Sequence, residues 1–104
     1  MKPVLKTLLI SLVLTASANA ANHIIDQKNK TFIPHAITVA VGDTITFKNS
    51  DPFAHNAYTD DEENEFDIGM QAAGTDAKIA VKAVGVFSVE CAIHPNMLLE
   101  VTVK

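Results

Sequence analysis

Three side chains able to bind a metal ion follow one another near the end of the chain. Cys91, His94 and Met97 form a C-x-x-H-x-x-M motif. Cys91 ends one run of alternating apolar residues, and Met97 is in phase with the apolar positions of the next run. Because alternate residues of a strand point to the same face of a sheet, the three side chains can converge on one point inside a β protein.

A histidine from an earlier part of the chain can complete this group. His55 follows the loop Asn49 to Ala54, directly after another predicted core strand. One thiolate, two imidazoles and a thioether suit copper that alternates between Cu(I) and Cu(II), since soft sulfur favours the reduced ion and imidazole accepts both. Zinc is not usually bound by methionine. The residue types therefore predict a single copper ion at His55, Cys91, His94 and Met97.

Cys91 is the only cysteine, which excludes a disulfide within the chain. It remains open from composition alone whether Cys91 is a buried free thiol, half of an intermolecular disulfide or a metal ligand. In the simplest alternative, Cys91 and Met97 are core residues and His94 is a solvated loop residue.

The remaining residues of similar chemistry are predicted to have ordinary roles. His23 and His35 lie outside the ligand loops and are expected at the surface. Met70 is expected to pack rather than to bind metal. The acidic run from Asp60 to Glu65 is interpreted either as a solvated loop or as a docking site for a partner protein, since clustered charge can steer association.

Apolar residues at every second position predict short strands that would position these ligands. Ile37 to Val41 and Ile45 to Phe47 flank a Gly-Asp turn signal and predict a hairpin. A single helical turn is the most that 62–70 suggests. Many short strands indicate an all-β sandwich. Further strands are predicted around 24–25, 79–81, 87–91 and 99–103.

Size and charge restrict the possible functions. The chain has 104 residues, of which 48% are hydrophobic, and this fits one small domain. Arginine is absent and the formal net charge is -4, so a nucleic-acid partner is not expected.

The first residues predict export. Lys2 and Lys6 lie just before a short apolar stretch. Two small-x-small cleavage signals follow that stretch, and they end at Ala18 and Ala20. The apolar stretch is too short to span a membrane. We therefore expect a signal peptide over 1–20, a single domain over 21–104, and a soluble periplasmic product.

Two longer segments resemble the cupredoxins, the small blue copper proteins, and among them the amicyanin and plastocyanin types. They are Val41-Gly42-Asp43-Thr44-Ile45-x-Phe47-x-Asn49 and Gly85-x-Phe87-x-Val89-x-Cys91-x-x-His94-Pro95-x-Met97. The resemblance implies a Greek-key β-sandwich with type 1 copper at one end. It further implies that His55, Cys91 and His94 are the strong ligands, that Met97 is the axial one, and that Asn56 ties the two ligand loops together. The chain is short for this family, so an abbreviated amino-terminal strand is expected.

The predicted function is one-electron transport between periplasmic redox proteins, with a copper carrier or chaperone as the alternative. An enzyme is not expected, because Glu90 and Ala92 stand beside Cys91 where related copper enzymes place histidines. The predicted partner is a c-type cytochrome or a dehydrogenase that docks near His94 and the run from Asp60 to Glu65. The protein is expected to be a monomer, with the ring edge of His94 at the surface and His55 behind it.

Overall fold

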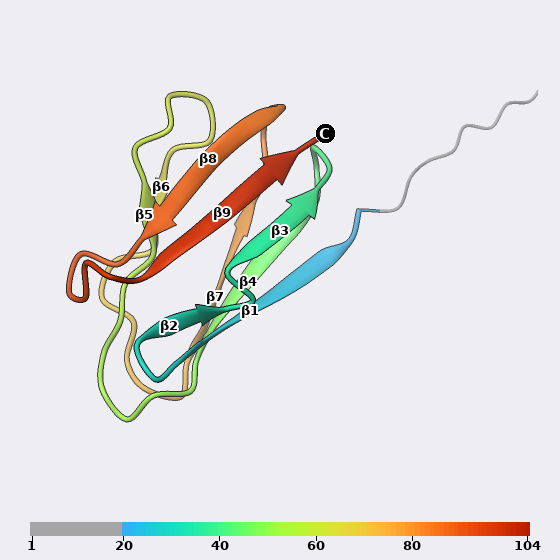
Figure 1. Cartoon of the computed structure of the whole chain (residues 1–104). Helices are drawn as coiled ribbons and strands as arrows, with labels where there is room; N and C mark the ends of the chain where they lie inside the picture. The colour runs from blue at the N-terminus through green and yellow to red at the C-terminus, as the bar shows by residue number, and fades with distance from the viewer. Residues whose placement is uncertain (1–19) are drawn as a thin grey trace, which may run out of the picture.

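The computed structural model describes residues 20–104, which form nine strands and no helix (Figure 1). The predicted leader lies outside these residues except for Ala20. No helix in the described part is long and apolar enough to cross a membrane. The strands are β1 (Asn22–Lys28), β2 (Thr31–Ile33), β3 (Ala36–Val39), β4 (Thr44–Asn49), β5 (Tyr58–Thr59), β6 (Phe66–Asp67), β7 (Asp76–Ala80), β8 (Gly85–Glu90) and β9 (Leu98–Val103).

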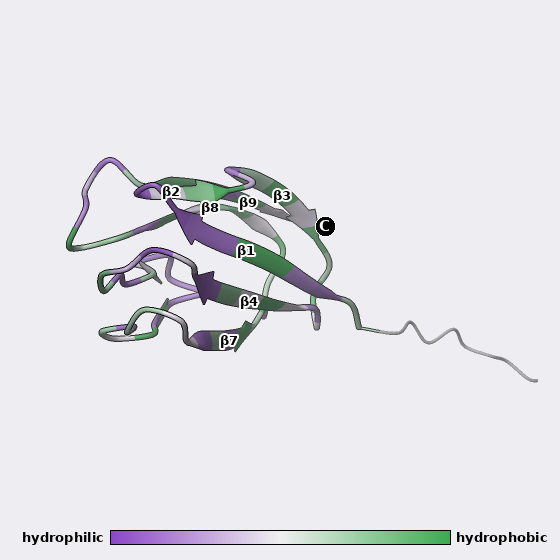
Figure 2. Cartoon of the chain, turned by 90° about the horizontal axis from the view of Figure 1, so that it is seen from below, coloured by the Kyte–Doolittle hydropathy of each residue, from purple (hydrophilic) through white to green (hydrophobic). Residues whose placement is uncertain are grey.

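The strands form two sheets packed face to face, as the predicted sandwich requires. One sheet has the order β2-β1-β4-β7 and the other β3-β9-β8-β5-β6. Figure 2 shows β8, β9 and β3 in one layer and β1, β4 and β7 in the other. The chain crosses between the sheets after β2, β3, β4, β6 and β7. The end of β4, the end of β8 and the start of β9 consequently meet at one end of the sandwich.

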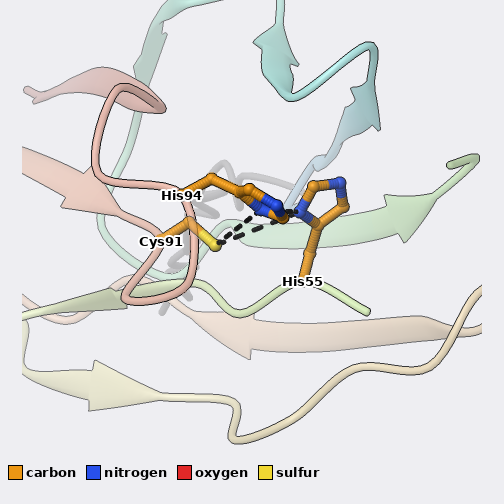
Figure 3. A group of neighbouring side chains, drawn as sticks. All are labelled: His55, Cys91 and His94. Atoms are coloured by element: carbon orange, nitrogen blue, oxygen red, sulfur yellow. Dashed lines mark hydrogen bonds between the residues drawn. The ribbon is translucent and has the colours of Figure 1, made fainter. Parts of the chain in front are cut away.

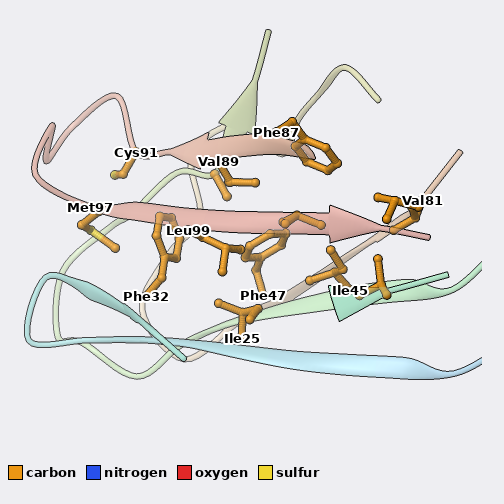
Figure 4. Close-up of a cluster of buried hydrophobic side chains, with 14 residues drawn as sticks. Ile25, Phe32, Ile45, Phe47, Val81, Phe87, Val89, Cys91, Met97 and Leu99 are labelled. Carbon is orange, nitrogen blue, oxygen red and sulfur yellow. The ribbon is translucent and has the colours of Figure 1, made fainter. Parts of the chain in front are cut away.

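Alternation in the sequence produces the core between the layers. In β9, Leu99, Val101 and Val103 are buried, while Leu98 before them and Glu100 between them are exposed. Phe47 of β4 contacts Phe32 and Phe66 through its ring, with centroids 6.1 Å and 5.8 Å apart. Figure 4 shows the side chains of both sheets meeting in this layer. The buried cluster consists of Ile25, Phe32, Val39, Ile45, Phe47, Ala57, Val81, Phe87, Val89, Cys91, Met97, Leu99, Val101 and Val103.

The predicted hairpin between 37–41 and 45–47 is wrong. β3 pairs in parallel with β9, whereas β4 pairs with β1 and β7 in the opposite sheet. A period of two marks a strand with one buried face, but it does not show whether the next strand pairs with it in the same sheet or packs against it from the opposite sheet. Val41, predicted to face inward, lies beyond the end of β3 and is 50% exposed.

The amino-terminal part also differs from the prediction. β1 is seven residues long, the longest strand in the described chain, so the expected abbreviation is wrong. Residues 32 and 33, outside the strand predicted around 24–25, belong to the separate strand β2, which pairs with β1. The helical turn suggested for 62–70 is replaced by a turn and the two-residue strand β6.

Candidate metal centre

His55, Cys91 and His94 meet at the end of the sandwich, and their donor atoms all lie within 4.8 Å of one another (Figure 3). The thiol Sγ of Cys91 is 4.0 Å from Nδ1 of His55 and 3.9 Å from Nδ1 of His94. The two Nδ1 atoms are 3.1 Å apart. One ion bound at about 2.0–2.3 Å from each donor fits all three separations, because none exceeds twice such a bond length.

Two strand ends place Cys91 and Met97 at this end of the sandwich. Cys91 directly follows β8 and is 1% exposed, and Met97 directly precedes β9 and is also 1% exposed. The loop between them is short and closed by the Met97 N–H, which donates to the carbonyl of His94. Figure 4 shows the side chains of Cys91 and Met97 at the same end of the core.

His55 is fixed from behind by a buried carboxylate. Its Nε2 lies 2.7 Å from Oδ2 of Asp51, and both side chains are buried. Asp51 also accepts backbone N–H groups of Asn29 and Lys30, in the turn between β1 and β2. Burial opposes the charged form of Asp51, but the hydrogen bonds from His55, Lys30 and Asn29 outweigh it and lower the pKa. With the Nε2 proton donated to Asp51, the Nδ1 lone pair of His55 faces the other ligands.

Asn56 joins the two ligand-bearing loops, as the resemblance implies. Its side-chain oxygen accepts the N–H of Ala92, next to Cys91. Its amide nitrogen donates to Asp67 and to the carbonyl of Gly69. Both ends of the Asn56 amide are therefore used, so the loop carrying His55 cannot move independently of the loop carrying Cys91.

Phe53 covers the two histidines. Its ring centroid lies 5.4 Å from that of His55 and 5.5 Å from that of His94. The Lys30 ammonium lies 5.5 Å from the Phe53 ring centroid, within cation–π range. Desolvation of His94, and then the charges of His55 and Lys30, lower the pKa of His94. A neutral His94 leaves Nδ1 free to bind a metal ion near neutral pH.

A row of buried amides supports this end of β4. Gln71 exchanges backbone hydrogen bonds with His55, and its side chain donates to the carbonyls of Phe47 and Thr75. Asn49 donates to the carbonyl of Gln71, and Gln27 donates to the Gln71 side chain at 2.6 Å. These amides replace strand pairing where the chain leaves the sheet, because buried backbone groups require partners.

Several residues of this site were not found from the sequence. Asp51 and Phe53 lie in the predicted loop Asn49 to Ala54 and received no role there, and Gln71 received none either. The spacing of Asp51 four residues before His55 is nevertheless a usable signal. His94 is half-buried and His55 is fully buried, which confirms the predicted exposure of the two ligands. Met70 is 75% exposed, so the prediction that it packs is wrong.

The two other histidines have different surroundings. His35 is exposed, as predicted. His23 is half-buried and lies 2.9 Å from a carboxylate oxygen of Asp43, so it is paired rather than freely solvated.

The acidic run from Asp60 to Glu65, here called the acidic loop, joins β5 to β6. β5 begins beside the end of β8, where Tyr58 pairs with Glu90. The loop then extends away from the ligands until Asn64 bonds to Ala83, which precedes β8 (Figure 1). Its exposed carboxylates therefore lie along the sheet edge rather than around His94; they belong to Asp60, Glu62, Glu63 and Glu65.

Comparison with known proteins agrees with this geometry. The family described as "Copper binding proteins, plastocyanin/azurin family" matches residues 19–104. Plastocyanin from Capsella bursa-pastoris is 33% identical over 70% of this chain and 87% of its own length. A reduced amicyanin variant superimposes with a TM-score of 0.71 at 22% identity, over 79% of this chain and 81% of that one. A copper-containing nitrite reductase from Thermus scotoductus gives a TM-score of 0.74 at 22% identity, covering 90% of this chain but only 25% of the enzyme.

Proposed function

Because the chain belongs to the plastocyanin/azurin family of copper-binding proteins, we propose that it is a one-electron carrier using one copper ion held by His55, Cys91, His94 and Met97. The observation that carries the proposal is the convergence of one thiol and two Nδ1 atoms within 4.8 Å at one end of a rigid sandwich. This donor set suits a cation that alternates between Cu(I) and Cu(II).

Copper, when bound, supplies the reversible one-electron exchange. The chain supplies a fixed site: Cys91 is held by β8, His55 by Asp51, and the two loops by Asn56. A site that is already arranged need not reorganise when the charge of the ion changes. This preorganisation favours rapid electron exchange over metal release.

His94 is the proposed electron port. It is half-buried, whereas His55 and Cys91 are almost completely covered. Phe53 and Ile93 beside it are partly exposed, at 37% and 43%. A partner protein that docks at this end of the sandwich therefore comes closest to the metal site at the His94 ring, while Cys91 and His55 stay covered.

The proposed electron carrier is not given a catalytic role. Its curated relatives are plastocyanins, and the chain spans only a quarter of the nitrite reductase that it resembles in fold. The proposed setting is the periplasm, after removal of residues 1–20, and the proposed partners are c-type cytochromes or a dehydrogenase. The acidic loop is proposed as the surface that attracts a basic partner.

Rapid mixing of the copper-loaded protein with a c-type cytochrome tests electron transport directly. We expect electron exchange over repeated cycles while copper stays bound in the presence of a moderate chelator. A copper carrier instead would lose its ion to the chelator and exchange electrons slowly. That result would overturn the proposed function without affecting the family assignment.

A further inference from the structure

Asp43 lies at the end of the sandwich opposite the ligands and joins three segments. Its backbone N–H donates to Ala40, and its carbonyl accepts the N–H of Val81, after β7. Its side chain reaches the residue before β1, since Oδ1 accepts the backbone N–H of Ala21 at 2.9 Å. The carbonyl of Ala21 in turn accepts the N–H of Thr44.

This carboxylate is surrounded by donors but lacks a strong cation. Oδ2 lies 2.9 Å from Nε2 of His23 and accepts the N–H of Ala40. The Ala21 N–H, followed by His23 and the Ala40 N–H, lowers the pKa of Asp43 to about 2. No lysine within residues 20–104 forms an ion pair with it. Asp43 is thus ionised, it is only 7% exposed, and His23 is the one side chain of residues 20–104 paired with it.

Ala21, whose N–H binds Asp43, lies next to a predicted leader cleavage site. Ala21 directly follows the Ala18-x-Ala20 cleavage signal. We propose that Asp43 is the receptor for the α-ammonium group that leader cleavage between Ala20 and Ala21 creates. The backbone nitrogen that now donates as an amide to Oδ1 becomes the charged partner that the carboxylate lacks.

The chemistry of the cleavage is peptide hydrolysis by a leader peptidase. One water molecule is consumed as the Ala20–Ala21 bond breaks, leaving a carboxylate on Ala20 and an amine on Ala21. The amine is protonated in most molecules near neutral pH, because an α-amino group titrates at about 7.7–8.0. Cleavage after Ala18 would leave Ala21 as an ordinary amide and Asp43 without its cation, so the structure favours the later site.

The proposed ion pair has a defined pH dependence. The amine faces Asp43 and, through that carboxylate, His23. The neighbouring end of β7 is uncharged, since the strand ends at Ala80 and Val81 follows it. An ammonium paired with a carboxylate has a raised pKa. Its stabilising effect is therefore complete below the ordinary amine pKa and disappears as pH rises through the higher pKa of the folded protein.

The test uses the full chain, exported and recovered from the periplasm. Intact-mass measurement should give a product beginning at Ala21. The rate at which acetic anhydride labels the Ala21 amine, measured against pH by peptide mass spectrometry, should be roughly threefold to tenfold slower at neutral pH than that of an unpaired α-amine. Labelling of the exposed lysines in the same sample provides the internal reference.

Asp43→Asn is the matched variant, since it keeps the size of the side chain and removes the charge. It should return the labelling rate to that of an unpaired amine. His23→Gln leaves the carboxylate in place and should keep the slow rate, which serves if Asp43→Asn folds poorly. A mature chain beginning at Asn19, or an Ala21 amine with ordinary reactivity in the wild-type protein, would overturn the proposal.

Discussion

Replacing Asp51 by Asn tests whether the buried carboxylate behind His55 holds the metal centre in place. Asp51 accepts three hydrogen bonds, at 2.7 Å from His55, 2.7 Å from Asn29 and 3.0 Å from Lys30. An asparagine has almost the same shape but only one accepting oxygen. Because His55 and Lys30 share Oδ2, the orientation of the asparagine amide that loses fewer hydrogen bonds keeps an oxygen at that position. It turns the new NH₂ group toward the N–H of Asn29.

The expected cost follows from these contacts. One charge-assisted hydrogen bond is lost, worth about 1.5–3 kcal/mol, and two others lose their charge. Asn29 and Lys30 are exposed, so water can replace part of the loss. We therefore expect the metal-free protein to be destabilised by about 2 kcal/mol. The copper potential should also rise, because removing an anion behind a ligand disfavours Cu(II) more than Cu(I).

Urea unfolding of the metal-free protein, followed by circular dichroism, measures the first effect. With a slope of about 1–2 kcal/mol/M for a small domain, the midpoint should fall by about 1–2 M. Asp26→Asn is the control, because Asp26 accepts a hydroxyl of Ser50 at the surface and does not contact a ligand. Equal midpoints for the Asp51 and Asp26 variants, together with an unchanged potential, would refute the role given to Asp51.

Four further outcomes are expected. Met97→Leu should keep the intense colour of the copper protein but raise its potential, since loss of a weak donor destabilises Cu(II) more; an unchanged potential in voltammetry would remove Met97 from the ligand set. The second variant neutralises the four exposed carboxylates of the acidic loop and keeps Asp61, which caps the turn within the loop. It should associate more slowly with a basic cytochrome, and the association rate should depend less on salt. Equal association rates for the variant and the wild-type protein at low salt would show that the loop is only solvated and does not attract the partner. Leu99→Ala should destabilise the metal-free protein by about 2–5 kcal/mol in urea unfolding, because Leu99 is fully buried; a cost below 1 kcal/mol would contradict the packing described for the core. Asp43, with its pKa lowered to about 2, should contribute stability above the unfolded pKa of about 3.9 and lose it as pH falls through about 2; Asp43→Asn should make acid unfolding less steep in that range.

The sequence predicted the strands better than their arrangement. Leu99, Val101 and Val103 are buried as their alternation indicates. The same alternation in Ile37 to Val41 and Ile45 to Phe47 led to a hairpin that does not exist, because the pattern reports which face is buried and not which strand is the neighbour. Pairing depends on contacts between distant segments, such as β3 with β9.

The ligand group was predictable because its chemistry is local in sequence. Three of its members lie within seven residues, and the residue types alone restrict which metal ions the group can bind. The supporting contacts were harder to predict. Asp51 can hold His55 in place because its other hydrogen bonds are fixed by the turn between β1 and β2. Phe53 covers the two histidines because two loops bring both imidazole rings against its ring.

The visible absorption and electron paramagnetic resonance spectra of the copper-loaded protein test the central claim most directly. A thiolate from Cys91 bound to Cu(II) with His55 and His94 should give an intense visible charge-transfer band that disappears on reduction and is absent from Cys91→Ser. The metal-free Cys91→Ser protein should still fold, which circular dichroism checks. A weakly coloured wild-type protein, or a Cys91→Ser protein with the same intense band, would contradict the assignment of this centre as type 1 copper.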